Sequence, residues 1–210
     1  MKWVFFGSPD FSAHALSILK ERGLVPDLII TAPDRPAGRG LVLTPSPVKI
    51  WAEHNGVEVL APEKLKDESV RSRLEQTKWD FFLVFAYGKI LRDWLLNMPT
   101  CGTLNIHPSL LPKFRGSSPI TSFILSNETE TGVTIMKIDE EVDHGPILSQ
   151  EVIPLDSDIT APEAEMQLAE AGAHMFSDII ESYCAGTLTP KEQDHSQATF
   201  TQKYTKEDGL

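Results

Sequence analysis

The chain has 210 residues, 41% of them hydrophobic, which is enough to bury one good core. Its formal net charge of −11 argues against broad nucleic-acid binding, because phosphate contacts need clustered Lys and Arg, although such a sum can hide a local basic patch. The first residues hold no apolar run long enough for a signal peptide or a membrane span, and Cys101 and Cys184 lack metal-ligand spacing. We therefore expect a cytoplasmic protein with reduced cysteines and no bound metal, and we expect a monomer.

The first part of the chain alternates strand and helix patterns. A short apolar run at 2–6 is followed by Ser8 and Pro9, which we interpret as the N-cap and first residue of a helix. The apolar stretch at 25–32 is typical of a strand covered on both faces. This order predicts an α/β fold, with a Rossmann-like, mostly parallel sheet, helices on both faces and a single domain. The first strand is not followed by GxGxxG, so no nicotinamide cofactor is expected.

Residues 33–47 are too long and too punctuated for an ordinary connection. They hold four prolines, two arginines and two glycines before a helix that we expect to begin near Ser46. Long loops of this kind are usually functional, and the alternative is a surface excursion whose arginines are only solvated. Further along, residues 80–85 read as a strong strand, and residues 86–91 are expected to turn from it into a short helix.

The strand pattern at 103–107 ends in chemistry-bearing side chains. Asn105 and His107 alternate with apolar residues and so leave the strand on one face, and Pro108 ends the strand there. An isolated His in this place is usually a satisfied core residue. Here, however, a loop at 140–146 supplies Asp143 between two predicted hairpin strands, 132–139 and 147–155. The three residues fit an oxyanion donor, a general base and an orienting carboxylate.

A long helix is predicted after this hairpin. Thr160 and Glu163 form a capping box, and the helix is expected to end at Gly186. Its apolar stripe reads as core packing, formed by Leu168, Ala171, Met175, Ile179 and Tyr183.

Asn105-x-His107, the SLLP sequence at 109–112 and Asp143 resemble the signature of enzymes that transfer a formyl group from 10-formyltetrahydrofolate to an amine. Within this family, the chain is most similar to the bacterial methionyl-tRNA formyltransferases. The matching stretches are FFGSPDF at 5–11, PDRPAGRG at 33–40, TPSPVK at 44–49, AYG at 86–88 and ETGVTIM at 130–136.

The resemblance implies formyl transfer from 10-formyltetrahydrofolate to methionyl initiator tRNA, with Asn105, His107 and Asp143 as catalytic residues. It implies folate contacts at two turns, formed by Phe85, Ala86, Tyr87, Gly88, Ile90, Leu91, Ser109, Leu110, Leu111 and Pro112. It also implies tRNA contacts by Arg35, Arg39 and Lys49, since arginine pairs with phosphate and stacks on unpaired bases.

The resemblance further implies a catalytic domain at 1–200. Residues 201–210 then form a truncated linker toward an absent C-terminal domain, through truncation or as a naturally short member. Two other functions remain open. One is formyl transfer to a small amine such as a nucleotide-linked amino sugar, and the other is a non-catalytic folate-binding module.

Overall fold

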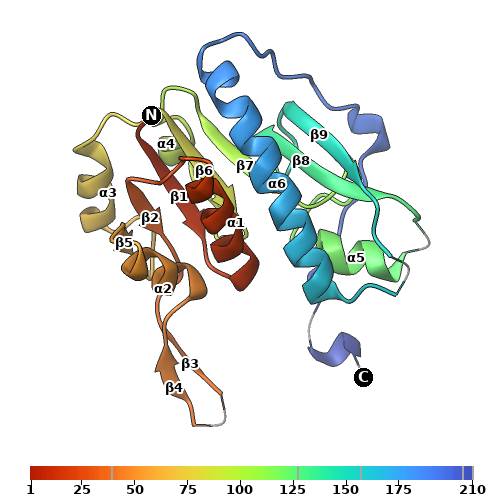
Figure 1. Ribbon diagram of the computed structural model, residues 1–210, viewed down its shortest axis with the longest axis horizontal. Helices are drawn as coiled ribbons and strands as arrows, with labels where there is room; N and C mark the ends of the chain where they lie inside the picture. Colours follow the sequence, from red (N-terminus) through yellow and green to blue (C-terminus); the bar gives the residue numbers. More distant parts are fainter. Residues whose placement is uncertain (39, 127, 157, 205, 210) are drawn as a thin grey trace. The chain divides into compact units, whose positions relative to one another are not determined.

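The computed structural model describes residues 1–38, 40–126, 128–156, 158–204 and 206–209. The chain divides into two compact units, Met1–Leu104 and Asn105–Leu210, and each is described by itself (Figure 1).

The first unit is built on parallel strands in the order β5-β2-β1-β6. These are β1 (Trp3–Gly7), β2 (Leu28–Ile30), β5 (Glu58–Leu60) and β6 (Phe81–Phe85). Every residue of β1, β2 and β6 is buried, which explains their apolar sequences, because a strand covered on both faces has no polar side. Gly7 pairs with Phe85, so the carboxyl ends of β1 and β6 lie at one edge of the sheet.

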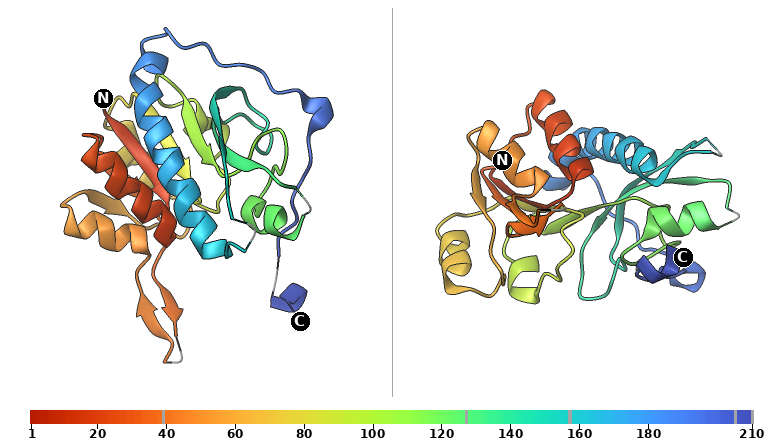
Figure 2. Two further views of the ribbon diagram at one scale, coloured as in Figure 1. Left: turned by 45° about the vertical axis from the view of Figure 1, so that its right-hand side comes forward. Right: turned by 90° about the horizontal axis from the view of Figure 1, so that it is seen from below.

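Helices cover both faces of these strands. They are α1 (Asp10–Glu21), α2 (Pro47–His54), α3 (Glu68–Glu75) and α4 (Asp93–Leu96). Figure 2 shows α1 and α2 on one face and α3 and α4 on the other. Ser46 caps α2 as expected, its Oγ accepting from the Lys49 N–H at 3.1 Å. The predicted cap at Ser8 is wrong: Pro9 is the N-cap of α1, and the Ser8 hydroxyl instead accepts from the Ala32 N–H at 3.0 Å.

The long segment before α2 forms a hairpin of β3 (Arg35–Ala37) and β4 (Val42–Thr44), which projects from the first unit (Figure 1). Its apolar residues Leu41, Val42 and Leu43 are all exposed. Because a hairpin buries nothing on its own, this exposure indicates that its role lies outside the core of the unit.

The helix expected at 86–91 is absent from those residues. Ala86 and Gly88 have φ angles of 53° and 76°, which a right-handed helix cannot include, and α4 begins only at Asp93.

The second unit contains β8 (Thr131–Lys137) and β9 (Ile147–Ile153), which pair antiparallel as predicted. Strand β7 (Thr103–His107) precedes them in the strand order and crosses the boundary between the units. Helix α5 (Pro119–Leu125), helix α6 (Ala161–Cys184) and the short helices η1 (His195–Gln197) and η2 (Lys206–Gly209) complete the unit.

Helix α6 packs on β8 and β9 and begins with the predicted capping box, in which the Thr160 N–H donates to Glu163 at 2.9 Å. The predicted stripe was only partly correct. Leu168 and Met175 are buried, whereas Ala171, Ile179 and Tyr183 are half-buried. The remaining core positions are taken by Ala164, Ala169, Gly172, Ala173, Phe176 and Ile180. The face of α6 that meets the sheet therefore includes Gly172, where an added Cβ would be 2.5 Å from Ile106 Cγ2.

The α/β class with a mostly parallel sheet is confirmed. Among the described residues, no helix is both long and apolar enough to cross a membrane. The expectation of reduced thiols is wrong for the structure, in which Cys101 and Cys184 are both disulfide-bonded. A disulfide depends on which residues a fold brings within reach, and sequence spacing does not reveal this.

Candidate active site

The site is built around His107, the last residue of β7. Its side chain is buried, and Nε2 lies 3.1 Å from the carbonyl oxygen of Phe114. Because a carbonyl oxygen only accepts hydrogen bonds, Nε2 is the protonated donor. This contact orients the ring and leaves Nδ1 as the nitrogen available for chemistry.

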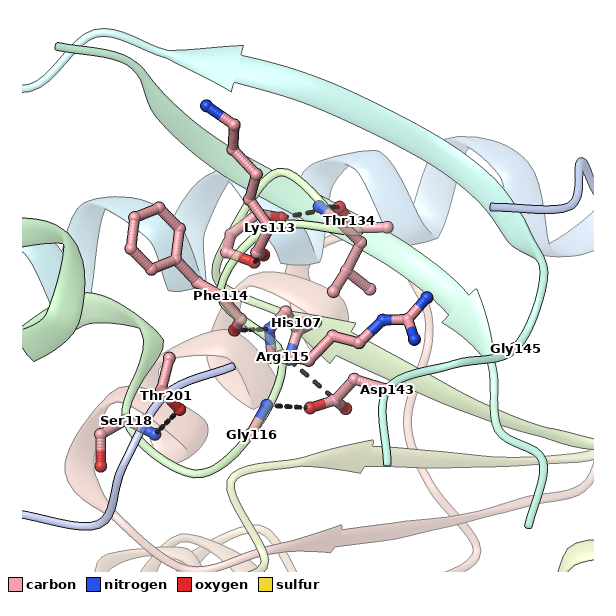
Figure 3. Close-up of polar contacts among 12 residues, drawn as sticks. His107, Lys113, Phe114, Arg115, Gly116, Ser118, Thr134, Asp143, Gly145 and Thr201 are labelled. Carbon is pink, nitrogen blue, oxygen red and sulfur yellow. Dashed lines mark hydrogen bonds and ion pairs between the residues drawn. The ribbon is translucent and has the colours of Figure 1, made fainter. Parts of the chain in front are cut away.

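Asp143 meets the other edge of the ring, as shown in Figure 3. It lies in the loop between β8 and β9, and its Oδ1 is 3.6 Å from His107 Nδ1. Its Oδ2 accepts a hydrogen bond of 2.7 Å from the Gly116 N–H. The φ angle of Asp143 is 48°, an unfavourable value for a non-glycine residue, which persists only where surrounding contacts impose it. The structure therefore brings His107 and Asp143 together.

Asn105 lies on the same strand, two residues before His107. Alternate residues of a strand point to one face, so its amide belongs to the same face as the imidazole. Asn105 is half-buried, which leaves part of its side chain accessible. An amide donor beside an imidazole–carboxylate pair can stabilise an oxyanion while the imidazole moves a proton.

The turn at 109–112 is held in place by β8 and β9. Thr134 donates from Oγ1 to the Ser109 carbonyl at 2.7 Å, and the Leu111 N–H donates to the same Oγ1 at 3.2 Å. Gln150 Nε2 donates to the Leu111 carbonyl at 2.8 Å. The Leu111–Pro112 peptide bond is cis. These contacts give the turn a defined backbone conformation.

The predicted folate contacts of the first unit have different environments. Phe85 packs in the core against Phe11 with ring centroids 5.2 Å apart, and Ile90 is exposed. Tyr87 and Leu91 are buried. The Tyr87 hydroxyl has no hydrogen-bond partner in the described parts of the chain, and its burial raises the pKa of Tyr87.

Two of the predicted tRNA contacts, Arg35 and Lys49, form ion pairs. Arg35 Nη2 lies 2.6 Å from Glu63, and Lys49 Nζ lies 2.8 Å from Asp34. The hydrogen bond to Asp34 raises the pKa of Lys49 above its usual value. Arg39 lies outside the described residues. A phosphate bound by Arg35 or Lys49 would compete with these carboxylates for the same charged groups.

Three residues beside the pair were not assigned a role from the sequence. Arg115 is buried, and its Nη2 contacts Gln193 Oε1 at 2.7 Å and His195 Nδ1 at 2.9 Å. Gln193 in turn donates to the carbonyls of the Asp143 loop. The position of Arg115 shortly after the SLLP turn could have identified it as a site residue. No sequence motif indicates such a role for Gln193 or His195.

His144 does not take part in the pair, although it adjoins Asp143. Its Nδ1 lies 2.7 Å from Asp139 Oδ2, and its ring stacks on His195 at a centroid distance of 4.0 Å. No group of three or more His, Cys, Asp or Glu residues within the described ranges is placed to hold a metal ion.

Comparison with known proteins identifies the class. The model of the family described as formyl transferase matches residues 1–180, and the chain belongs to this family.

Two relatives are both methionyl-tRNA formyltransferases. That of Chloroflexus aurantiacus is 45% identical over 209 residues, which cover 100% of this chain and 67% of the relative. That of Halalkalibacterium halodurans is 43% identical over 207 residues, which cover 99% of this chain and 65% of the relative. The chain thus spans about two thirds of the length of these curated relatives.

Solved structures support the same fold. The phosphoribosylglycinamide formyltransferase of Streptococcus pneumoniae matches with a TM-score of 0.70 at 24% identity, covering 86% of this chain and 97% of that one. An N-formyltransferase of Helicobacter canadensis, in complex with folinic acid and dTDP-3-aminofucose, also matches with a TM-score of 0.70, at 20% identity, covering 96% of this chain and 70% of that one.

Proposed function

We propose that this chain transfers the formyl group of 10-formyltetrahydrofolate to the α-amine of methionyl initiator tRNA. The observation that carries the proposal is the contact between His107 and Asp143 at the end of a strand that also carries Asn105. The names of relatives that are 42–45% identical over the chain support tRNA as the acceptor. The sugar formyltransferases match at only 20% identity, a likeness that supports the fold alone.

In the proposed reaction, the amine nitrogen attacks the formyl carbon to give a tetrahedral intermediate. The bond from this carbon to N10 of the folate then breaks, and a proton passes from the amine to N10. Asn105 donates its amide to the formyl oxygen as negative charge develops there. One such donor typically stabilises the transition state by roughly 3 kcal/mol.

His107 carries the proton in this proposal. Its Nε2–H is engaged by the Phe114 carbonyl, so Nδ1 accepts the proton of the attacking amine and passes it to N10. Asp143 faces the same nitrogen and stabilises the ring while both nitrogens are protonated. The 3.6 Å separation is longer than a hydrogen bond, and we expect it to shorten when Nδ1 takes up the proton.

We place the folate contacts on backbone groups and apolar side chains of two turns. In the first unit they are Phe85, Ala86, Tyr87, Gly88, Ile90 and Leu91, and in the second unit Ser109, Leu110, Leu111 and Pro112. The positive φ angles of Ala86 and Gly88 and the hydrogen bonds around Thr134 support turns of fixed shape.

We place the tRNA contacts on Arg35, Arg39 and Lys49. The exposed hairpin on which Arg35 lies is suited to a large acceptor, because it adds nothing to the core of its unit. Each phosphate contact by such a residue makes binding weaker as salt rises.

We also propose that the catalytic part comprises residues 1–200. The Arg115 N–H donates to the Thr199 carbonyl at 2.9 Å, which supports a catalytic part that reaches this point of the chain. We propose that the protein is cytoplasmic, since charged initiator tRNA is found there. We also propose that it is a monomer. Light scattering tests the oligomeric state, and thiol alkylation in freshly lysed cells tests whether Cys101 and Cys184 are reduced in the cytoplasm.

The function is tested by formyl transfer from 10-formyltetrahydrofolate to four acceptors: methionyl initiator tRNA, methionyl elongator tRNA, free methionine and a nucleotide-linked amino sugar. We expect turnover on the initiator tRNA. In the Arg39→Ala variant, we expect the KM for tRNA to rise about tenfold and the KM for folate to stay unchanged. Arg71→Ala removes an exposed arginine from α3 and is the matched control. Turnover on the amino sugar alone would overturn the proposal, and folate binding without turnover on any amine would favour a non-catalytic module.

A further inference from the structure

Gln193 links the main chain of the Asp143 loop to the loop that binds the Asp143 carboxylate. We infer that Gln193 is a positioning residue, which holds Asp143 at the distance and angle from His107 that proton transfer needs. The kinetic part of this inference rests on the proposed function, whereas its geometric part does not.

Both polar atoms of the Gln193 amide form hydrogen bonds to the Asp143 loop or to Arg115. Its Nε2 donates to the carbonyls of Asp143 and Gly145, at 3.0 and 2.7 Å, and its Oε1 accepts from Arg115 Nη2 at 2.7 Å. An amide has two N–H donors, and both are directed at carbonyl oxygens of the same loop. Gln193 is only 6% exposed, so water does not readily replace these bonds.

These contacts close a ring around Asp143. The carboxylate accepts from the Gly116 N–H at 2.7 Å, Gly116 follows Arg115 in the chain, and Arg115 donates to Gln193. Gln193 Nε2 in turn donates to the carbonyl oxygen of Asp143, which closes the ring. Asp143 is therefore held through its side chain and through its main chain by contacts that depend on the same glutamine.

The conformation of Asp143 is one that needs such support. Its φ angle of 48° is disfavoured for a residue with a Cβ, and strained residues persist at functional sites only when their surroundings over-determine them. The loop is also closely packed, because a Cβ at Gly145 would lie 2.0 Å from the Lys137 carbonyl oxygen. Gln193 donates to the carbonyls of these two residues, Asp143 and Gly145.

The tail that carries Gln193 is itself paired with the loop at 112–118. Arg115 bridges Phe200 in a parallel arrangement, and its N–H donates to the Thr199 carbonyl at 2.9 Å. Thr201 Oγ1 accepts from the Ser118 N–H at 3.2 Å, a contact drawn in Figure 3. Gln193 is thus presented by a segment with a defined path. Its charged and titratable neighbours are Arg115, Asp143 and, through Arg115, His195.

The test compares Gln193→Leu with Gln202→Leu, an exposed glutamine of the same tail. Leucine keeps much of the volume of Gln193 and removes the donors without adding charge. Three properties are measured: kcat, KM for the folate, and the ring ¹⁵N shifts of His107 by NMR. Calorimetric folate binding gives the fraction of active molecules, so a loss caused only by misfolding is divided out.

We expect kcat per folate-binding site to fall about 10- to 100-fold in Gln193→Leu, with KM for the folate within about twofold and displaced His107 shifts. Gln202→Leu should match the wild type in all three. Unchanged kcat and unchanged His107 shifts in Gln193→Leu would overturn the inference. If Gln193→Leu does not fold, Gln193→Glu is measured in the same way, because it keeps the acceptor for Arg115 and loses the amide donors.

The kinetic and spectroscopic outcomes separate this inference from the proposed function. If the wild type transfers formyl to no amine, the proposed function fails. Displaced His107 shifts in Gln193→Leu, absent in Gln202→Leu, would still establish the positioning role, and undisplaced shifts would refute it.

Discussion

Oδ1 of Asp143 lies 3.6 Å from Nδ1 of His107, although α5 and β8 separate the two residues in the sequence. Each partner is also held on its far side by the loop that follows β7. The Phe114 carbonyl accepts from Nε2 of His107, and the Gly116 N–H donates to Oδ2 of Asp143. A shift of this one loop would therefore move both partners.

The first prediction concerns the charge of this pair. Asp143→Asn keeps the size of the side chain and removes the carboxylate that stabilises the protonated ring, so kcat for formyl transfer should fall about 10²-fold with little change in KM. Glu140→Gln, which neutralises an exposed acid in the same loop, is the control. Steady-state kinetics at fixed pH make the comparison, and equal rates in the two variants would contradict the role of Asp143.

Thr134 fixes the turn at 109–112 from the middle of β8. Thr134→Val preserves its shape but leaves the Leu111 N–H and the Ser109 carbonyl without this buried hydroxyl. The free energy of unfolding should fall by about 1–3 kcal/mol, and KM for the folate should rise if the turn binds it. Urea denaturation and folate kinetics measure the two effects. Thr187→Val, at an exposed position, should change the free energy of unfolding by no more than about 0.5 kcal/mol.

Gly172 sets the closeness of α6 to the sheet. An added Cβ would lie 2.5 Å from Ile106 Cγ2 and 3.2 Å from Val133 Cγ1. Gly172→Ala should therefore destabilise the protein by about 1–3 kcal/mol, although the same exchange in an uncrowded helix stabilises it by up to about 1 kcal/mol. Urea denaturation measures the change, and His174→Ala, on the exposed face of the same helix, is the control for the free energy of unfolding. A gain in unfolding midpoint for Gly172→Ala would show that the helix can move away without cost.

The ion pair between Glu58 and Arg73 makes stability depend on pH. Arg73 donates to both carboxylate oxygens, at 2.7 and 2.6 Å, and these hydrogen bonds lower the pKa of Glu58. A carboxyl whose pKa is lower in the folded state stabilises the fold above its unfolded pKa of 4.5, and this stabilisation is lost as the pH falls through the folded pKa.

Glu58→Gln should therefore cost up to about 1 kcal/mol at pH 7, allowing for the partial exposure of the pair, and almost nothing well below pH 4. Urea denaturation at both pH values measures this difference. Glu75→Gln breaks the exposed pair with Arg71 and should cost less at pH 7. A cost for Glu58→Gln that is the same at both pH values would mean that packing, rather than charge, explains it.

Short-range patterns predicted much of this fold. The alternation at 103–107, bounded by Pro108, predicted β7 and the shared face of Asn105 and His107, and the hairpin pattern placed Asp143 between β8 and β9. Ser46 was correctly identified as the cap of α2. These features depend on residues a few positions apart, so the chain encodes them locally.

The predictions failed where a tertiary contact or a local positive φ angle overrode the pattern expected from the sequence. The Ser8 hydroxyl accepts from Ala32 instead of capping α1, and positive φ angles at Ala86 and Gly88 delay α4 to Asp93. Gln193 reaches the Asp143 loop from 50 residues away in sequence. By itself, the sequence determined most of the parallel strands, the β8–β9 hairpin, the caps of α2 and α6, and the residue types proposed for the candidate site. Only the tertiary structure decided which nitrogen of His107 faces Asp143 and which tail residues hold the loop, because such contacts depend on the path of the whole chain and not on any local period.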